Sequence, residues 1–127
     1  MKKILLVEDE KSLCLLYKEE LAEEGYKVTA VQNAEAALEA LSKEKFDLLI
    51  TDIRMPGKNG IELATQVISR HPDMPVIINT AYQSYKDDFK TWAADAYIVK
   101  SSSLDELKAK IKELIENLHA PTQKRPD

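Results

Sequence analysis

The sequence predicts a single α/β domain in which a parallel sheet is covered by helices on both faces. Short apolar runs alternate with amphipathic helical patterns from one end of the chain to the other, in the order βαβαβαβαβα. A length of 127 residues suits one domain and is too short for two ordinary ones. Strict alternation requires right-handed crossovers between parallel strands, which place helices on both sides of the sheet. We therefore expect a three-layer, doubly wound fold with five strands.

Five apolar segments are the predicted strands. Four of them are unbroken and rich in β-branched residues, and the fifth, which spans 26–31, is more alternating. Runs that are short and continuous are typical of strands buried on both faces, as in a parallel sheet. The four unbroken segments are residues 4–7, 48–50, 76–78 and 97–99.

The segments between these strands show helical spacing, with capping residues at their ends. Gly25 stands where a left-handed cap ends the first helix, and Asn33 can cap the second. A capping oxygen also stands three residues before an acid in the pairs Asn59 and Glu62, Ser84 and Asp87, and Ser103 and Glu106. The inward faces are predicted to carry Leu13, Leu16, Tyr17 and Leu21 in the first helix, Ala34, Ala37, Leu38 and Leu41 in the second, and Leu104, Leu107, Ile111, Leu114 and Leu118 in the last.

Composition excludes several classes of protein. Apolar residues make up 44% of the chain and charged residues 31%, which is the mix of a soluble globular protein. No apolar run is long enough to cross a membrane and no secretory signal is visible, so we expect a cytoplasmic protein. The single cysteine, Cys14, excludes an internal disulfide and is interpreted as a small buried side chain. A net charge of −4 argues against direct binding of nucleic acid.

Two segments are distinguished along the chain. Residues 1–118 carry all of the alternating pattern and form the predicted domain. Residues 119–127 are polar and contain proline, which predicts a frayed tail or the beginning of a linker.

Polar residues that end the apolar runs form the candidate site. Glu8 and Asp9 follow the first run, Asp52 the third, Thr80 the fourth and Lys100 the fifth. Ligands of open parallel sheets bind beyond the carboxyl ends of the strands, where these side chains converge. Acids after strands also occur because loops are wet and helices favour acidic first turns, so each residue alone is weak support. Together and in this order they indicate a site.

The chemistry of this set points to a phosphoryl group. Clustered carboxylates repel one another unless a cation lies among them. Hard oxygen ligands without histidine or thiolate select Mg²⁺, with Mn²⁺ as a substitute. An acidic cup beside Lys100 suits a phosphoryl group, and a carboxylate such as Asp52 can act as its nucleophile. Thr80 could donate its hydroxyl to a phosphoryl oxygen.

Four segments carry a family resemblance that covers about residues 2 to 118. They are "LLVEDE", "DLLITDIRMPGKNGIEL" with its Asp-x-x-Met-Pro-Gly-x-x-Gly motif, "VIINTAY" and "ADAYIVK". With these segments the chain resembles the receiver domain of bacterial two-component response regulators. The resemblance implies a flavodoxin-like (βα)5 fold with strand order 2-1-3-4-5.

The resemblance also implies roles for single residues. Asp52 would be the phosphoacceptor, and Mg²⁺ would be held by Glu8, Asp9 and Asp52 together with the backbone carbonyl of Arg54. Thr80 and Lys100 would contact the bound phosphoryl group. The implied donor is a phosphohistidine on a sensor histidine kinase or a histidine phosphotransfer protein.

A switch and an output surface follow from the same resemblance. Tyr97 matches the switch aromatic, which would fill the space left when Thr80 moves toward the phosphoryl group. An unidentified protein partner would bind the fourth helix, the fifth strand and the fifth helix. The predicted fourth helix carries Tyr85, Phe89 and Trp92 on one face, and packing against the sheet is the simpler explanation of that face.

Ser101 is the main departure from the pattern of the family, which usually has proline after the lysine. A cis peptide before a residue other than proline costs about 2.5–4 kcal/mol, so we expect a trans bond and a reshaped loop. Ala93 and Ala96 also stand where a glycine and often an acid are common. None of these departures removes a chemical group from the site.

The predicted function is a phosphorylation-dependent signalling switch rather than an enzyme. The alternative is an interaction module that keeps the receiver fold and signals without phosphorylation. A haloacid-dehalogenase-like phosphatase would need a second acid where Arg54 stands, and a flavin carrier would need a phosphate loop after the first strand. The chain could act alone, as chemotaxis-type and phosphorelay-type regulators do, or as the receiver of a longer regulator.

Overall fold

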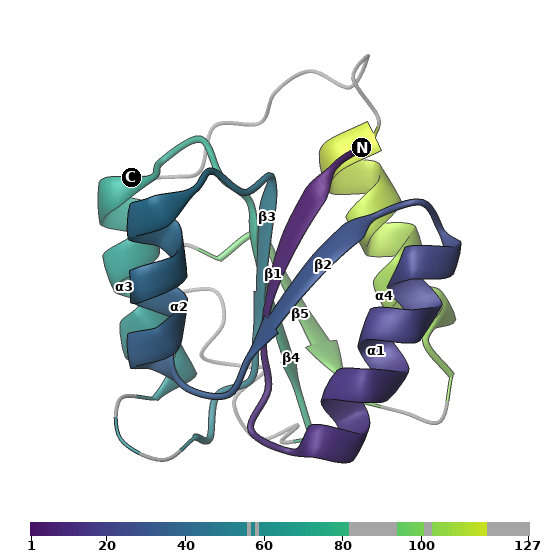
Figure 1. Ribbon diagram of the computed structural model, residues 1–127, viewed down its shortest axis with the longest axis horizontal. Coiled ribbons are helices and arrows are strands. Elements are labelled where there is room, and N and C mark those ends of the chain that lie inside the picture. The colour runs from purple at the N-terminus through teal and green to yellow at the C-terminus, as the bar shows by residue number, and fades with distance from the viewer. Residues whose placement is uncertain (56, 58, 82–93, 101–102, 117–127) are drawn as a thin grey trace.

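The computed structural model describes residues 1–55, 57, 59–81, 94–100 and 103–116 (Figure 1). The predicted fourth helix with Tyr85, Phe89 and Trp92, the peptide that joins Lys100 to Ser101, and the tail 119–127 all lie outside these residues. The described elements are β1 (Lys3–Val7), α1 (Lys11–Glu23), β2 (Lys27–Val31), α2 (Ala34–Lys43), β3 (Leu48–Thr51), α3 (Gly60–Arg70), β4 (Val76–Thr80), β5 (Ala96–Val99), α4 (Asp105–Ile111) and the π-helical turn η3 (Lys112–Glu116).

The strands form one parallel sheet with the order β2-β1-β3-β4-β5, which confirms the predicted topology. Their carboxyl ends are aligned by the pairing register. Val7 of β1 pairs with Thr51 of β3, and Thr80 of β4 pairs with Val99 of β5. Residues that directly follow these positions therefore emerge at one edge of the sheet.

Helices cover both faces of the sheet, as the alternating pattern predicts. Figure 1 shows α1 and α4 on one side and α2 and α3 on the other. Each face has its own apolar core, because successive strand residues point to opposite sides. The core beneath α1, α4 and η3 includes Tyr17, Ile77 and Ile98, whereas the core beneath α2 and α3 includes Leu63, Ile78 and Tyr97.

The predicted capping residues of three helices are confirmed. Gly25 follows α1 with a φ of 94°, in the left-handed region that glycine occupies without steric cost. The Asn33 side chain accepts a hydrogen bond of 2.8 Å from the N–H of Ala36 at the start of α2. Asn59 does the same for the N–H of Glu62 in α3, at 2.9 Å.

The predicted inward face of α1 is wrong at Leu16. That side chain is 45% exposed, and Cys14 is buried together with Tyr17 and Leu21. Cys14, Tyr17 and Leu21 follow one another at spacings of three and four residues, which is one helical stripe. Leu16 precedes Tyr17 directly and therefore lies about a quarter turn or more away from that stripe.

The last helix differs from prediction at both ends. Leu104, not Ser103, is the residue before its first turn, and the Ser103 hydroxyl instead accepts a hydrogen bond of 3.1 Å from the N–H of Asp105. At the other end Ile115, which the stripe did not include, is buried, and the predicted Leu114 is half-buried against the same core. The wider π-helical turn η3 brings a residue four positions after Ile111 back to the same face.

The helices within these described ranges are too short or too polar to cross a membrane.

Candidate functional site

Backbone hydrogen bonds between neighbouring strands fix the residues at the carboxyl edge of the sheet. The N–H of Glu8 donates to the carbonyl of Val31 at 3.0 Å, and the N–H of Asp52 donates to the carbonyl of Val7 at 3.3 Å. The N–H of Lys100 donates to the carbonyl of Thr80 at 2.7 Å. The site is therefore built on strand ends that are held by the sheet itself.

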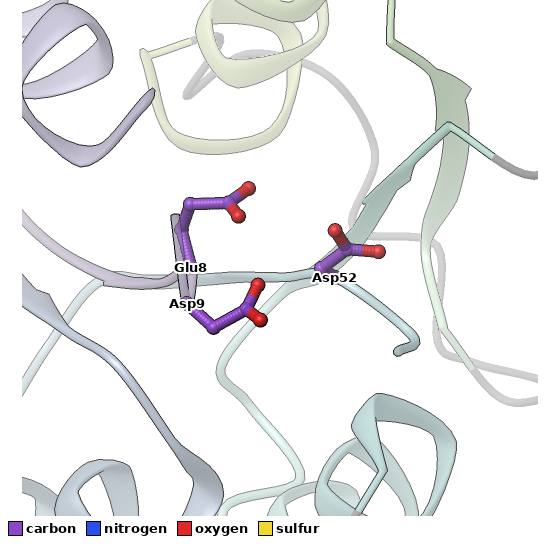
Figure 2. Close-up of side chains that lie close together, drawn as sticks. All are labelled: Glu8, Asp9 and Asp52. Atoms are coloured by element: carbon purple, nitrogen blue, oxygen red, sulfur yellow. The ribbon is translucent and has the colours of Figure 1, made fainter. Parts of the chain in front are cut away.

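Three carboxylates converge at this edge. Glu8, Asp9 and Asp52 each offer an oxygen, and these oxygens all lie within 4.8 Å of one another (Figure 2). Glu8 and Asp52 are only 2% and 7% exposed, whereas Asp9 is exposed. An all-oxygen set that is open to water on one side suits Mg²⁺, which usually keeps several of its own waters. The residues present thus fit the ion that the sequence predicts.

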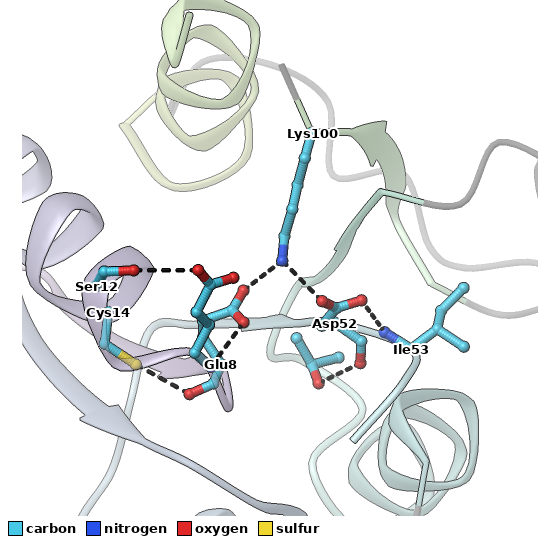
Figure 3. A network of polar contacts seen from close by, with 8 residues as sticks. Glu8, Ser12, Cys14, Asp52, Ile53 and Lys100 are labelled. Atoms are coloured by element: carbon cyan, nitrogen blue, oxygen red, sulfur yellow. Dashed lines mark hydrogen bonds and ion pairs between the residues drawn. The ribbon is translucent and has the colours of Figure 1, made fainter. Parts of the chain in front are cut away.

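Lys100 bridges two of these carboxylates. Its Nζ lies 2.5 Å from Oε1 of Glu8 and 2.7 Å from Oδ2 of Asp52, as Figure 3 shows. Burial alone would lower the pKa of Lys100, but hydrogen bonds to Asp52 and Glu8 outweigh it and raise that pKa to about 12. Lys100 therefore remains a cation that balances the buried negative charge.

For the pKa of Glu8, burial outweighs the hydrogen bonds. Burial raises the pKa of its carboxyl, and the hydrogen bonds from Lys100 and from the N–H of Glu10 only partly offset that effect. Removing either partner would therefore make Glu8 easier to protonate. Its negative charge depends on Lys100 or on another cation in the same place.

Asp52 is held at its backbone as well as at its carboxylate. Oδ1 accepts a hydrogen bond of 2.6 Å from the N–H of Ile53, and the backbone carbonyl accepts one of 2.9 Å from the Thr51 hydroxyl. Gly60, the first residue of α3, packs against the same carbonyl so closely that an added Cβ would lie 1.7 Å from the oxygen. The first residue of α3 thus restricts the position of the Asp52 backbone.

The other predicted site residues lie nearby or on the same strands. Thr80 is fully buried at the end of β4. Tyr97 pairs with Ile78, and both belong to the core beneath α2 and α3, the side that Thr80 also faces by alternation along β4. Arg54 is exposed two residues after Asp52.

Two residues next to the site were not predicted from the sequence as part of it. Gly60 is the last position of the Asp-x-x-Met-Pro-Gly-x-x-Gly motif, and that motif was its only signal. Cys14 is buried, as expected, and its thiol also donates a hydrogen bond of 2.9 Å to the backbone carbonyl of Glu8 (Figure 3). Burial, followed by the charges of Glu8 and Asp9, raises the pKa of this thiol, so it stays protonated and able to donate.

Comparison with solved structures finds the same architecture in response regulators. The response regulator TrrA of Thermotoga maritima, solved in complex with Mg²⁺ and BeF, is 46% identical with a TM-score of 0.86, covering 90% of this chain and 99% of that one. A chain of the complex between histidine kinase ThkA and TrrA matches with 46% identity and a TM-score of 0.85, covering 91% of this chain and 99% of that one.

Sequence comparison gives the same family. The transcriptional regulatory protein RprY of Bacteroides fragilis is 35% identical over 126 residues, which is 96% of this chain and 52% of RprY. The regulator NtrC of Escherichia coli is 33% identical over 124 residues, which is 96% of this chain and 26% of NtrC. The chain thus spans about half or less of the length of these relatives. The sequence model of the family described as "Response regulator receiver domain" matches residues 4–112. Its fold, its carboxylate cluster and these matches agree, and the chain belongs to the response regulator receiver domain family of two-component systems.

Proposed function

We propose that the protein is a phosphorylation-dependent switch that accepts a phosphoryl group on Asp52. One observation carries the proposal. The Asp52 carboxylate is buried at the sheet edge, paired with Lys100 at 2.7 Å and clustered with Glu8 and Asp9. A nucleophilic carboxylate, a cation for the phosphoryl oxygens and ligands for a hard metal ion are the groups that this transfer requires.

The transfer uses the groups of the site as follows. A carboxylate oxygen of Asp52 attacks the phosphorus of a phosphohistidine, the O–P bond forms, and the P–N bond breaks. The imidazole nitrogen leaves with the electron pair. Lys100 moves its hydrogen bond from Oδ2 of Asp52 to a phosphoryl oxygen, and the Thr80 hydroxyl donates to another. The protein is a reactant that becomes phosphorylated, so its role is that of a switch rather than an enzyme.

Glu8, Asp9 and Asp52, together with the backbone carbonyl of Arg54, are the proposed Mg²⁺ ligands, and Mn²⁺ has the same ligand preference. When bound, the ion neutralises charge on the phosphoryl oxygens. An ion held there would compete with Lys100 for the carboxylates of Glu8 and Asp52.

The proposed donor is a sensor histidine kinase or a histidine phosphotransfer protein in the cytoplasm. The match to TrrA, which has been solved with the histidine kinase ThkA, supports the first of these. Phosphorylation would shift Thr80 toward the phosphoryl group and allow Tyr97 to follow. This movement would change the surface formed by β5, the last helix (α4) and the predicted helix that carries Tyr85, Phe89 and Trp92. A protein partner, rather than nucleic acid or a membrane, would bind that surface.

Intact-mass measurement after incubation with acetyl phosphate tests the proposal. We expect a gain of one phosphoryl group that requires Mg²⁺ and is absent in the Asp52→Asn variant. A wild-type mass that stays unchanged, while Mg²⁺ binding is intact, would contradict the proposal and favour a module that signals without phosphorylation.

A further inference from the structure

Thr51 places a buried hydroxyl directly before the proposed phosphoacceptor. It is the last residue of β3, it is 0% exposed, and its Oγ1 donates a hydrogen bond of 2.9 Å to the backbone carbonyl of Asp52. The other residues of β3 are leucine and isoleucine. Valine has nearly the shape of threonine and would bury no polar group, so this hydrogen bond is what distinguishes threonine at the position.

The Thr51 side chain points to the side of the sheet that α2 and α3 cover. Its partner across the sheet, Ile78, belongs to the core beneath those helices, and paired residues of a sheet point to the same side. Gly60 at the start of α3 packs against the same Asp52 carbonyl, where an added Cβ would lie 1.7 Å from the oxygen. The direction of this carbonyl is therefore set by contacts from both the strand and the helix.

The carbonyl is joined to the carboxylate of Asp52 through one peptide group. The carbonyl of Asp52 and the N–H of Ile53 belong to the same planar unit, so the direction of the oxygen also sets the direction of the N–H. That N–H donates a hydrogen bond of 2.6 Å to Oδ1 of Asp52 (Figure 3). The Thr51 hydroxyl therefore acts on the carboxylate through the backbone.

Two donors set the orientation of the carboxylate. Oδ1 accepts the N–H of Ile53, and Oδ2 accepts Nζ of Lys100 at 2.7 Å (Figure 3). In phosphoryl transfer the attacking oxygen has to lie in line with the bond that breaks, and a misplaced nucleophile reacts much more slowly. Loss of the Ile53 donor would let the carboxylate turn while its charge and its ion pair with Lys100 remain. The contribution of this donor is thus to orientation rather than to charge.

We infer that Thr51 is a positioning residue for phosphoryl transfer: its hydroxyl orients the peptide between Asp52 and Ile53, and that peptide holds the Asp52 carboxylate in the direction from which it attacks. This role rests on the proposed function of Asp52 and requires no contact between Thr51 and the phosphoryl group.

The variants Thr51→Val and Thr51→Ser separate the hydroxyl from the rest of the side chain. Valine keeps the branched shape and removes the donor, whereas serine keeps the donor and removes the methyl group. Each variant is incubated with acetyl phosphate at saturating Mg²⁺, and the rate of Asp52 phosphorylation is followed by intact mass. Thr51→Val should react roughly three- to tenfold more slowly than the wild type, and Thr51→Ser should retain most of the wild-type rate.

Urea unfolding separates this effect from a loss of stability. Thr51→Val loses a hydrogen bond and Thr51→Ser loses a packed methyl group, so both should be less stable than the wild type. Only Thr51→Val should also lose rate. If Thr51 served packing alone, serine would not rescue the rate that valine loses.

Hydrogen exchange of the Ile53 amide, measured by NMR, follows the peptide directly and does not depend on phosphorylation. The amide should exchange faster in Thr51→Val than in the wild type or in Thr51→Ser, because the N–H is no longer held toward Oδ1.

Thr65→Val is the matched control. The Thr65 hydroxyl also donates to a backbone carbonyl at 2.9 Å, but its acceptor is Ile61 on the exposed face of α3. This variant loses one threonine hydroxyl, as Thr51→Val does, and should keep both the wild-type rate of phosphorylation and the wild-type exchange of the Ile53 amide.

A Thr51→Val variant that is phosphorylated at the wild-type rate would overturn the inference. So would a Thr51→Ser variant that is slowed as much as Thr51→Val, or an Ile53 amide whose exchange is the same in Thr51→Val and the wild type. If the wild-type protein itself gains no phosphoryl group, the proposed function fails, and the exchange of the Ile53 amide still shows whether the Thr51 hydroxyl orients the peptide.

Discussion

Lys100 is the residue on which the charge balance of the site depends. Its side chain is 13% exposed, and its ammonium group contacts two carboxylates whose side chains are 3% and 8% exposed. Buried ion pairs add little net stability when intact, but removing one partner leaves an uncompensated charge in a low-dielectric setting. Removing Lys100 is therefore expected to affect stability as well as the proposed chemistry.

We expect Lys100→Met to lower the free energy of unfolding by about 3 kcal/mol without Mg²⁺, because Glu8 and Asp52 then repel each other without a cation. Saturating Mg²⁺ should restore more stability in this variant than in the wild type, since the ion supplies the missing positive charge. Urea unfolding with EDTA and with Mg²⁺ measures both effects. An equal Mg²⁺ response in the two proteins would contradict the proposed overlap of the two cation positions.

The pH dependence follows from the raised pKa of Lys100. The folded protein holds this proton up to a pKa of about 12, whereas the ordinary value is 10.5. The folded state thus binds more protons between these values, so the stabilisation is complete below pH 10.5 and is lost as pH rises to 12. Its size is about 2 kcal/mol. The difference in unfolding free energy between the wild type and Lys100→Met, measured across this window, should shrink as pH rises.

The start of α3 is the element that supports Asp52. Gly60 leaves no room for a Cβ beside the Asp52 carbonyl, and its N–H donates to the carbonyl of Ile53 at 2.7 Å. The helix cannot move back to accept a side chain without breaking this bond and the Asn59 cap. The start of α3 and the backbone of Asp52 are therefore held in place by the same contacts.

Gly60→Ala should destabilise the protein by about 3 kcal/mol, the upper end of the usual range for core overpacking, and slow phosphorylation of Asp52. Gly25→Ala is the control, because Gly25 has a φ of 94° and nothing within 4 Å of an added Cβ. It should cost about 1 kcal/mol of backbone strain and leave the phosphorylation rate unchanged. Thermal unfolding and intact-mass time courses give both quantities. Equal losses in the two variants would show that the contact at Gly60 is unimportant.

At the scale of elements, sequence patterns predict the helix caps, because a cap depends on the residue type at one position. Gly25, Asn33 and Asn59 were identified as caps because the backbone geometry there needs those residue types. Inward faces are harder to predict, because hydrophobicity alone does not say which leucine of α1 packs inward. Leu16 is exposed and Cys14 is buried because the helix begins at Lys11 and is oriented by Tyr17 and Leu21.

At the scale of the whole molecule, the sheet brings together residues that are far apart in sequence. Glu8, Asp52 and Lys100 could be grouped from the sequence because each follows a strand and parallel strands end at one edge. The contacts of Gly60 and Cys14 with Asp52 and Glu8 could not be grouped in this way. They depend on how helices pack against the sheet, which is a matter of side-chain shape rather than of periodicity.

Asp9→Asn separates metal binding from folding. Asp9 is exposed, so its loss should leave the metal-free stability within about 0.5 kcal/mol of the wild type. Mg²⁺ at ten times its dissociation constant should stabilise the wild type by about 1.4 kcal/mol and the variant by much less. Thermal unfolding over a Mg²⁺ series provides the comparison. A full Mg²⁺ response in Asp9→Asn would remove this residue from the proposed ligand set.

Because Lys100 already neutralises part of the charge of Glu8 and Asp52, the fold does not require a divalent ion at this site. If the proposed Mg²⁺ requirement holds, a fall in free magnesium would leave the protein folded but unable to accept a phosphoryl group. Signalling could resume as soon as the ion returns, with no need for new synthesis.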